Sequence, residues 1–444
     1  MKRTLLTLGL IVALVASFAC ERRDGTSTTG DSNAGAIKVG IYADLSGQTS
    51  SFGQSTKNGV TMAFDEINKA GGVNGRQLEF VIEDDQGQPA QAATVVTKLI
   101  NQDKVHAIIG EVASSNTLAA APVAQSAKIP MITPSSTNPT VTQKGDYIFR
   151  VCFTDNFQGA VMAKFAVNTL KAKTAAVLGD VNSDYSKGMT QYFEQEFNRL
   201  GGRIVTKQAY TQTDADFKGQ LTAIRSTNPD VIFVPGYYGQ VGVIAKQSKE
   251  LGIKAPLLGG DGWDAPQLWD LGGEALNGAF MANHYSIDDP SPAVKKFVDA
   301  YKARYGGTAP DAIAALAYDA AYVLADAIKR AGSTENAKIR DALAQTKNFA
   351  GVTGSISINE QRDAVKPAVV FELQNRKFVY KETIQPEGAS SGAPATGASP
   401  AGATTGASPA ATTGASPAAN ANTTSGNMNA GTTTNTNSTT NSTP

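Results

Sequence analysis

Short apolar runs alternate with amphipathic segments along most of the chain, which is the pattern of strands and helices in an α/β fold. A first block of predicted strands covers residues 37–42, 78–82, 105–109, 131–132 and 147–151. A second block covers residues 175–178, 204–209, 231–234, 257–258 and 280–285, and strand-like runs at 355–358, 369–373 and 378–380 follow, with a hairpin turn at Asn375. Because helices separate the strands, each block is expected to form a doubly wound lobe with a mainly parallel sheet.

Helical stripes fill the gaps between the strands, and some are bounded by glycine or proline. Residues 44–53 are expected to form a loop before the first helix, whose stripe stops at Gly71 and Gly72. Pro89 suits the first position of the next helix. The predicted helices are at 56–70, 89–100, 161–170, 185–200, 217–226, 241–251, 293–305, 311–330 and 337–344, with an Ala-rich helix opening at 114–117.

Two hydroxyl-rich loops follow consecutive strands of the first block. Ser114 to Thr117 come after the first of these strands and open a helix, and Ser135, Ser136 and Thr137 come after the second. The carboxyl ends of parallel strands meet at one sheet edge, so both loops are expected to face one crevice. A helix N-terminus offers unpaired N–H groups there, which suits a carboxylate, and neither loop holds a Lys or Arg. The alternative is that these residues are ordinary helix caps and turn residues.

Length and charge limit the classes of protein that this chain can belong to. The 444 residues exceed one comfortable core, which indicates about two domains with appendages. Lys and Arg equal Asp and Glu at 39 each, which argues against nucleic acid or an anionic membrane surface as the main partner.

Residues for enzymatic chemistry are scarce. The two histidines, His106 and His284, have no ligand-like neighbours at suitable spacing, so neither a metal site nor a cofactor is expected. No G-x-G-x-x-G sequence follows a strand, and GASSG at 388–392 lacks the strand and helix that a hydrolase nucleophile needs. An enzyme is therefore the minority interpretation.

The two ends of the chain differ in composition from the rest. Residues 1–20 read as an export signal that ends at Cys20, similar to a bacterial lipoprotein signal in which this cysteine is acylated; ordinary cleavage near Ala19 is the alternative. Residues 21–35 are expected to be a flexible linker, and residues 385–444, with repeats of TGASPA, a disordered tail. Cys152 then remains as a single cysteine in the folded part, where no internal disulfide is possible.

Several segments together resemble the branched-chain amino-acid binding proteins, extracytoplasmic receptors that deliver ligand to ABC importers. The segments that carry the resemblance are LSGQTSSFG, NGVTMAFDEINKAGGVNGRQLE, DDQGQP, IIGEVASSNT, MITPSSTNP, VNSDYSKG, PDVIFVPGYYGQ and LLGGDGW. The resemblance implies two lobes that close on ligand about three crossings, near Asp155, Tyr285 and Thr353. One lobe would then comprise 36–155 with 286–353, and the other 156–285 with 354–384.

The resemblance also assigns roles to individual residues. Ser114 and Thr137 match residues that hold the ligand's α-carboxylate, with the backbone at Ala113 and Ser135 alongside. Asp261 matches an acidic residue that pairs with the α-ammonium. The remaining matches are Tyr185 and Tyr237, which close over the ligand, and Phe52 and Val112, which line the side-chain pocket. A zwitterion that leaves water needs both charges matched, so this assignment agrees with the physical argument.

The sequence departs from the family pattern in ways that leave the ligand open. Ala113 and Gly87 stand where some members carry a disulfide, and Asp261 is shorter than the glutamate of others. Relatives also bind amides, urea-like molecules and aromatic acids, so the fold does not choose a ligand. The expected partners are a small molecule and an ABC permease, the expected state is a monomer in the periplasm or at the cell surface, and a sensor is the rival to a transporter.

Overall fold

The computed structural model describes residues 35–386. The predicted export signal with Cys20 and the TGASPA repeats lie outside these described residues, so they stay predictions. Within residues 35–386, no helix combines the length and the apolar character needed to cross a bilayer.

The first sheet has five strands in the order β2-β1-β3-β4-β5, and all of its neighbouring pairs are parallel. Its strands are β1 (Ile37–Ala43), β2 (Leu78–Asp84), β3 (Ala107–Ile109), β4 (Met131–Thr133) and β5 (Ile148–Arg150). This is the doubly wound order in which ligands bind at the carboxyl ends of the strands, where the order reverses. The fold class predicted from the hydrophobic pattern is confirmed.

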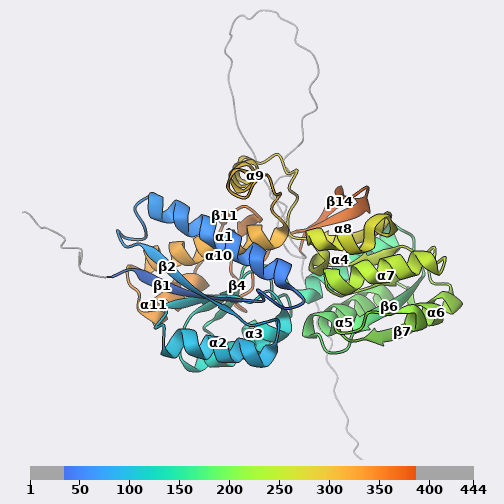
Figure 1. The fold of residues 1–444 in the computed structure, drawn as a ribbon, viewed down its shortest axis with the longest axis horizontal. Coiled ribbons are helices and arrows are strands. Elements are labelled where there is room, and N and C mark those ends of the chain that lie inside the picture. Colours follow the sequence, from blue (N-terminus) through green and yellow to red (C-terminus); the bar gives the residue numbers. More distant parts are fainter. Residues whose placement is uncertain (1–34, 387–444) are drawn as a thin grey trace, which may run out of the picture. The chain divides into compact units, whose positions relative to one another are not determined.

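Helices cover both faces of this sheet because its strands alternate between two cores. Val39 and Ile41 of β1 pack in one core with α1 (Ser50–Lys69), α10 (Ala312–Ala331) and α11 (Asn336–Ala344). Tyr42 packs in the other with α2 (Pro89–Asn101) and α3 (Ser114–Ser126). Figure 1 shows the orange C-terminal helices α10 and α11 beside the blue N-terminal elements, so this lobe is built from two distant parts of the chain.

The second sheet has seven strands in the order β14-β13-β10-β9-β8-β6-β7. Its strands are β6 (Thr174–Asp180), β7 (Arg203–Tyr210), β8 (Val231–Phe233), β9 (Leu257–Gly259), β10 (Ala279–Asn283), β13 (Ala368–Gln374) and β14 (Lys377–Ile384). β6 to β10 pair in parallel, and β13 and β14 add an antiparallel edge. The hairpin between β13 and β14 turns at Asn375 and Arg376, both with positive φ, as predicted for Asn375.

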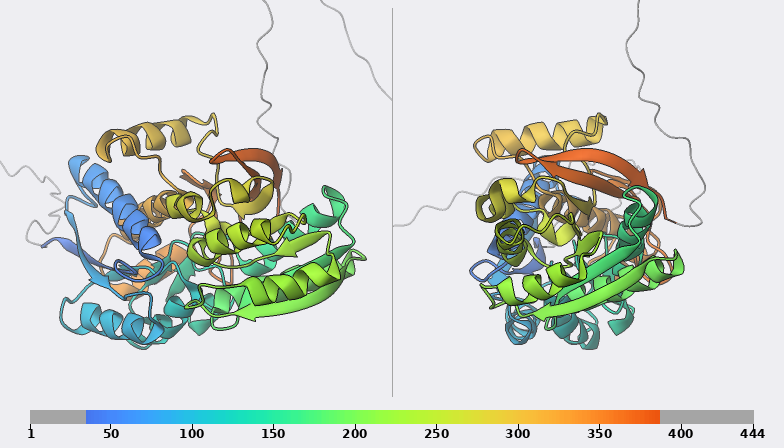
Figure 2. Two further views of the ribbon diagram at one scale, coloured as in Figure 1. Left: turned by 45° about the vertical axis from the view of Figure 1, so that its right-hand side comes forward. Right: turned by 90° about the vertical axis from the view of Figure 1, so that its right-hand side faces the viewer.

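Two sets of helices cover the second sheet. α4 (Asp155–Asn168) and α5 (Asp184–Arg199) pack on one face, while α6 (Lys218–Thr227), α7 (Tyr238–Glu250) and α8 (Pro266–Gly272) pack on the other. The remaining elements are α9 (Pro292–Arg304) and the small ladder of β11 (Phe349–Gly351) and β12 (Gly354–Ile356). Both views in Figure 2 place α9 and the β13–β14 hairpin along the same side.

Several predicted boundaries are wrong. α1 begins at Ser50 and α4 at Asp155, earlier than the predicted 56 and 161, and α8 and β11 were not predicted. The first turns of α1 and α4 lie under other parts of the protein, so they carry buried polar and small residues such as Gly53, Asp155 and Gln158 instead of an apolar stripe.

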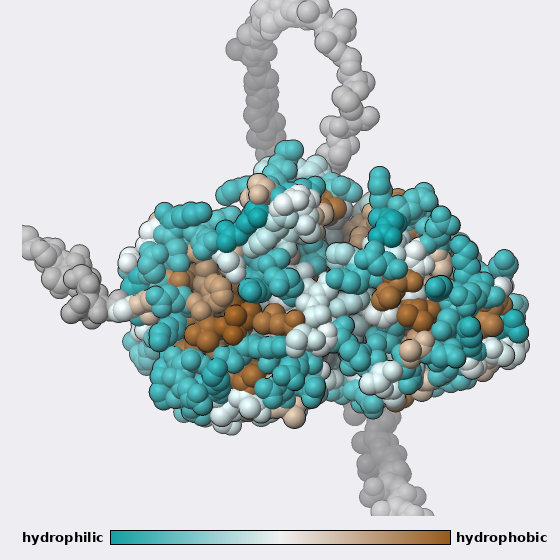
Figure 3. Space-filling model, in the orientation of Figure 1, coloured by the Kyte–Doolittle hydropathy of each residue, from teal (hydrophilic) through white to brown (hydrophobic). Residues whose placement is uncertain are grey.

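The surface carries few exposed large hydrophobic side chains among the described residues. The face in Figure 3 is mostly hydrophilic with separate, smaller hydrophobic areas. Among the described residues, the exposed large hydrophobic side chains are Val181, Leu271, Val365, Val379 and Tyr380.

Candidate functional site

The two hydroxyl loops lie side by side, because β3 and β4 are parallel neighbours in the first sheet. Their side chains are cross-linked: the hydroxyls of Thr117 and Ser136 are 2.6 Å apart, and Ser136 Oγ donates to the carbonyl of Glu111 at 2.8 Å. Thr133 Oγ1 accepts from the backbone N–H of Ser136 at 2.9 Å. These bonds fix the relative position of both loops before any ligand arrives.

Helix α3 points its first turn into the crevice from this lobe. Ala113 is its N-cap and Ser114 its first residue, and the first-turn N–H groups of a helix have no acceptor within the helix. Ser114 is buried, and its Oγ accepts from the backbone N–H of Asn138 at 3.2 Å. The hydroxyl hydrogen of Ser114 therefore remains to be donated elsewhere, for instance to a carboxylate.

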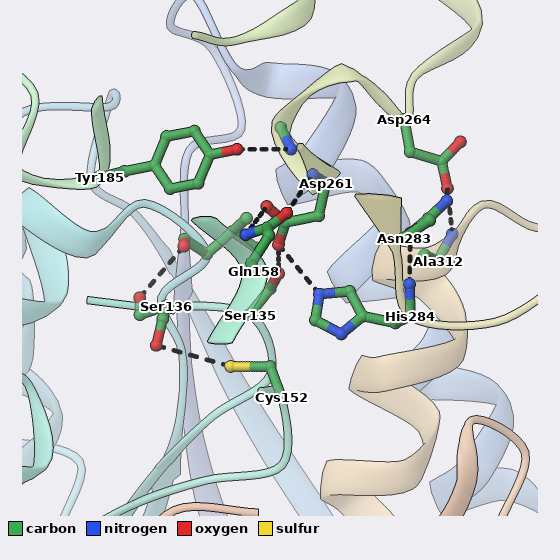
Figure 4. A network of polar contacts seen from close by, with 12 residues as sticks. Ser135, Ser136, Cys152, Gln158, Tyr185, Asp261, Asp264, Asn283, His284 and Ala312 are labelled. Carbon is green, nitrogen blue, oxygen red and sulfur yellow. Dashed lines mark hydrogen bonds and ion pairs between the residues drawn. The ribbon is translucent and has the colours of Figure 1, made fainter. Parts of the chain in front are cut away.

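The opposite wall comes from loops at the carboxyl ends of strands in the second sheet. Tyr185 lies in the first turn of α5 and Tyr237 is the N-cap of α7, and their rings stack at 5.3 Å between centroids. Burial raises the pKa of both phenols well above its usual value, so both keep the hydroxyl proton. The backbone N–H of Gly262 donates to the Tyr185 hydroxyl at 3.3 Å (Figure 4).

A small cavity of about 10 Å³ lies between these walls. A cavity of this size has room for about one water molecule, so the two walls must move apart to admit a ligand between them. Its lining residues are Phe52, Val112, Ser135, Tyr185, Tyr237, Asp261, Gly262 and Ile313. No basic side chain is among them, so a ligand anion would have to be received by neutral donors.

Asp261 is the charged group of the cavity and has a dense set of donors. Its side chain is nearly buried, and Gln158 Nε2 donates to Oδ1 at 3.0 Å while Gln158 Oε1 accepts from the Asp261 backbone N–H at 2.7 Å. Ser135 Oγ lies 3.4 Å from Oδ2, which places a hydroxyl of the first lobe against an acid of the second. His284 Nε2 lies 2.9 Å from the same oxygen. Figure 4 shows these side chains converging on Asp261.

A second buried acid lies beside the cleft. Asp155 begins α4, its backbone N–H donates to the carbonyl of Thr137 at 2.9 Å, and the Thr137 hydroxyl lies close enough to lower its pKa. Burial nevertheless raises the pKa of Asp155 well above its usual value. Within residues 35–386 neither carboxylate oxygen of Asp155 has a hydrogen-bond partner, which agrees with a protonated carboxyl group.

The two walls also touch around the rim of the cleft. Asn138 Nδ2 donates to the carbonyl of Asp184 at 2.8 Å, and the Asp184 N–H donates to Ser115 Oγ at 2.9 Å. On another side, the Tyr238 hydroxyl donates to the carbonyl of Gln48 at 3.1 Å. The Phe52 ring packs edge-on against Tyr238 at 4.9 Å and Tyr237 at 6.0 Å.

Most of the residues singled out from the sequence surround one point. Phe52, Val112, Ser135, Tyr185, Tyr237 and Asp261 line the cavity, while Ala113, Ser114 and Thr137 lie beside it and not on its wall. Sequence reasoning missed Gly262, Ile313, Gln158 and His284. His284 follows β10, so the rule on strand ends that located the hydroxyl loops could also have found it.

The sequence and the fold are similar to those of known proteins. Residues 36–377 match the sequence model of the family described as periplasmic binding protein. A leucine-, isoleucine-, valine-, threonine- and alanine-binding protein of Pseudomonas aeruginosa is 32% identical over 332 residues, which are 74% of this chain and 87% of that protein.

Two solved structures are also similar. A leucine-binding protein of Thermotoga maritima is 41% identical with a TM-score of 0.76, over 79% of this chain and 99% of that chain. A branched-chain amino-acid transporter substrate-binding protein of Streptococcus pneumoniae, solved with isoleucine, is 36% identical with a TM-score of 0.75, over 79% of this chain and 100% of that chain.

Proposed function

The chain belongs to the periplasmic binding protein family, and on that premise we propose that it is the extracytoplasmic solute-binding receptor of an ABC importer. Its ligand is an amino acid of the branched-chain type or similar, which it binds between its lobes and delivers to a permease. Members of this family bind solutes and are not enzymes, and the proposed role includes no chemical step.

The observation that carries the proposal is the opposition of unlike groups across one small cavity. Neutral hydroxyls and the first turn of α3 lie on one side of the cavity, and the carboxylate of Asp261 lies on the other. The distance from Ser135 Oγ to Asp261 Oδ2 is 3.4 Å. An amino-acid zwitterion needs this pairing, because either charge would be costly to bury alone. In this proposal Ser114 and Thr137, with the backbone at Ala113 and Ser135, receive the carboxylate, and Asp261 receives the ammonium.

The side chain of the ligand would meet the apolar part of the cavity. Phe52 and Val112 line it from the first lobe, Ile313 from α10, and the stacked Tyr185 and Tyr237 from the second lobe. These residues supply hydrophobic contact without a further charge, which favours an aliphatic side chain. The binding of leucine, isoleucine and valine by the Pseudomonas relative supports the same class.

Ligand binding is proposed to stabilise closure. The rim contacts of Asn138 with Asp184 and of Tyr238 with Gln48 exist only while the lobes are together. A ligand that touches both walls has contacts in the closed state that are absent from the open one, so it shifts the population toward closure. The crossings near Asp155, Tyr285 and Thr353 would form the hinge between lobe 36–155 with 286–353 and lobe 156–285 with 354–384.

The location outside the cytoplasm follows from the family, and the attachment is part of the proposal. We propose that acylated Cys20 tethers a monomeric receptor to a membrane through residues 21–35, so that it stays near its permease. Multiple acyl chains are needed for stable anchoring, since a single chain binds a membrane only weakly.

A ligand screen tests the proposed function directly. Thermal unfolding of the purified protein is measured against single amino acids, amides and aromatic acids, followed by calorimetry of each hit. A ligand at 100 times its dissociation constant stabilises the folded state by about 2.7 kcal/mol, which raises the melting temperature measurably. Stabilisation by branched-chain amino acids is the expected result. A response to amides or aromatic acids alone would contradict it.

A further inference from the structure

His284 is a buried histidine whose position the solute-binding role does not by itself require. It directly follows β10, is 2% exposed, and its ring stacks on Phe153 with 3.8 Å between centroids. Phe153 precedes the proposed crossing at Asp155, and His284 precedes the one at Tyr285. The imidazole is therefore held between two segments of the proposed hinge while its Nε2 edge faces Asp261 (Figure 4).

The contacts of the imidazole ring indicate which of its two nitrogens carries the proton. Nε2 lies 2.9 Å from Asp261 Oδ2, whereas Nδ1 is buried without a hydrogen-bond partner within residues 35–386. If the single proton of a neutral ring were on Nδ1, the lone pair of Nε2 would face the carboxylate of Asp261 and the Nδ1–H group would have no acceptor. The arrangement thus favours a proton on Nε2, donated to Asp261.

Asp261 is held in one orientation by this donor together with two others. Gln158 occupies Oδ1, and His284 and Ser135 occupy Oδ2. Of these three donors, only His284 can change its charge near neutral pH. Burial lowers the pKa of His284, Asp261 opposes this effect, and the charge of Lys366 lowers the pKa further. Asp261 and Lys366 are the charged groups that act on the ring, and the neutral form prevails at neutral pH.

We propose that His284 is a positioning residue for the ammonium anchor: its neutral imidazole orients Asp261 toward the ligand, and its protonation releases the ligand. The inference rests on the proposed function, because it assumes that Asp261 pairs with an ammonium group. An imidazolium at Nε2 would neutralise Asp261, so a proton on His284 and an ammonium on the ligand would compete for one carboxylate. Competition by one proton weakens binding by about tenfold for each pH unit below the pKa of the ring.

Three variants test this with calorimetry between about pH 4 and 8, the range in which histidines titrate. His284→Gln keeps an amide donor for Asp261 but no titratable group, and His284→Leu removes the donor. His106→Gln is the control, since His106 precedes β3 and lies at the amino end of its strand, away from the cleft. L-leucine is the probe, with the tightest amino acid of the screen as a second probe, and melting curves verify that each variant is folded.

The expected profiles differ between the variants. The wild type and His106→Gln lose affinity as the pH falls, whereas His284→Gln binds more tightly than His284→Leu at neutral pH and has a shallower pH profile than the wild type. Because His284→Gln differs from the wild type only at the ring, the difference between the two pH profiles isolates the effect of the ring. His284→Leu should bind about 10- to 100-fold more weakly at neutral pH, which is the effect of one hydrogen bond to a charged group.

The outcomes separate the two claims. If the wild type binds amino acids and His284→Gln follows the same pH profile, the positioning role is wrong and the proposed function stands. If the wild type binds no amino acid, the proposed function fails and the inference fails with it. Should His284→Leu not fold, the comparison of the wild type with His284→Gln decides alone.

Discussion

Asp261 combines burial with charge, which few carboxylates in a folded protein do without a counter-ion. Its relative exposure is 4%, and neutral donors from Gln158 and Ser135 with the His284 ring surround it. Hydrogen bonds orient the carboxylate but leave its negative charge unbalanced inside the cavity. A ligand that brings a positive group therefore completes the site, and this is the physical reason for assigning it the ammonium.

Removing this carboxylate gives the largest single effect that we expect. Asp261→Ala would leave the ligand's ammonium buried without a partner, which costs about 3 to 5 kcal/mol. Affinity measured by calorimetry should fall by roughly a hundred- to several-thousand-fold.

Asp264→Asn is the matched control for that variant. Asp264 is also a buried acid, but its Oδ2 accepts from Asn283 Nδ2 and from the Ala312 N–H, each at 2.8 Å, and it does not line the cavity. An asparagine oxygen can accept both bonds, so affinity should change little. Equal losses in the two variants would show that Asp261 acts through stability instead of through the ligand.

The sequence located the hydroxyl side of the site better than the acidic side. Ser114 and the loop at 135–137 follow consecutive strands, so a rule about neighbouring strand ends was enough to bring them together. Asp261 also follows a strand, β9, but only the family resemblance placed it opposite the hydroxyl loops, because those loops belong to the other sheet. No sequence pattern marked Ile313 as a cavity residue, since only the packing of α10 against the first sheet places it there.

At the level of elements, the start of α1 shows how tertiary contact overrides a hydrophobic stripe. Residues 44–53 read as a loop, yet α1 begins at Ser50 and runs past Gly53 over the backbone of Asp44. A Cβ atom at Gly53 would lie 1.8 Å from the Asp44 carbonyl oxygen, so only glycine allows this approach. The adjacent Phe52 is thereby placed in the cavity wall and against Tyr238.

Gly53→Ala should therefore disturb both the helix start and the cavity. Overpacking of this kind costs about 1 to 3 kcal/mol, and the melting temperature and the ligand affinity should fall together because Phe52 moves.

Gly219→Ala is the control: Gly219 lies in α6 with no atom within 4 Å of the added Cβ. Alanine in a helix is favoured over glycine by about 0.5 to 1 kcal/mol, so this variant should be slightly stabilised with unchanged affinity. Equal melting shifts in both variants would contradict the role given to Gly53.

Long stripes and turn residues made most elements predictable. The strands of both sheets and the turn at Asn375 follow from alternation of apolar runs and from local chemistry. The errors concentrate at the first turns of α1, α4 and α7, where the helix carries small or polar residues that are buried by other segments. Local periodicity does not record such burial, because the covering segment is distant in the chain.

At the scale of the whole described protein, two sheets of the same strand order offer their carboxyl edges to one cleft. The order of β2-β1-β3-β4-β5 in the first sheet is repeated by β7-β6-β8-β9-β10 in the second. The loops of the first sheet supply hydrogen-bond donors, and the loops of the second supply the carboxylate of Asp261. Neither set of loops alone can pair both charges of a zwitterion. Ligand binding and lobe closure are then coupled, since a ligand held by one lobe contacts the other lobe only in the closed state.

A crystal structure of the protein with the amino acid that binds most tightly in the screen tests this arrangement most directly. The ammonium nitrogen should lie about 3 Å from a carboxylate oxygen of Asp261, within hydrogen-bond distance. The carboxylate should face the first turn of α3, near Ser114 and Thr137, with the side chain between Phe52 and the two tyrosines. A ligand bound outside this cavity, or one whose carboxylate faces Asp261, would contradict the account.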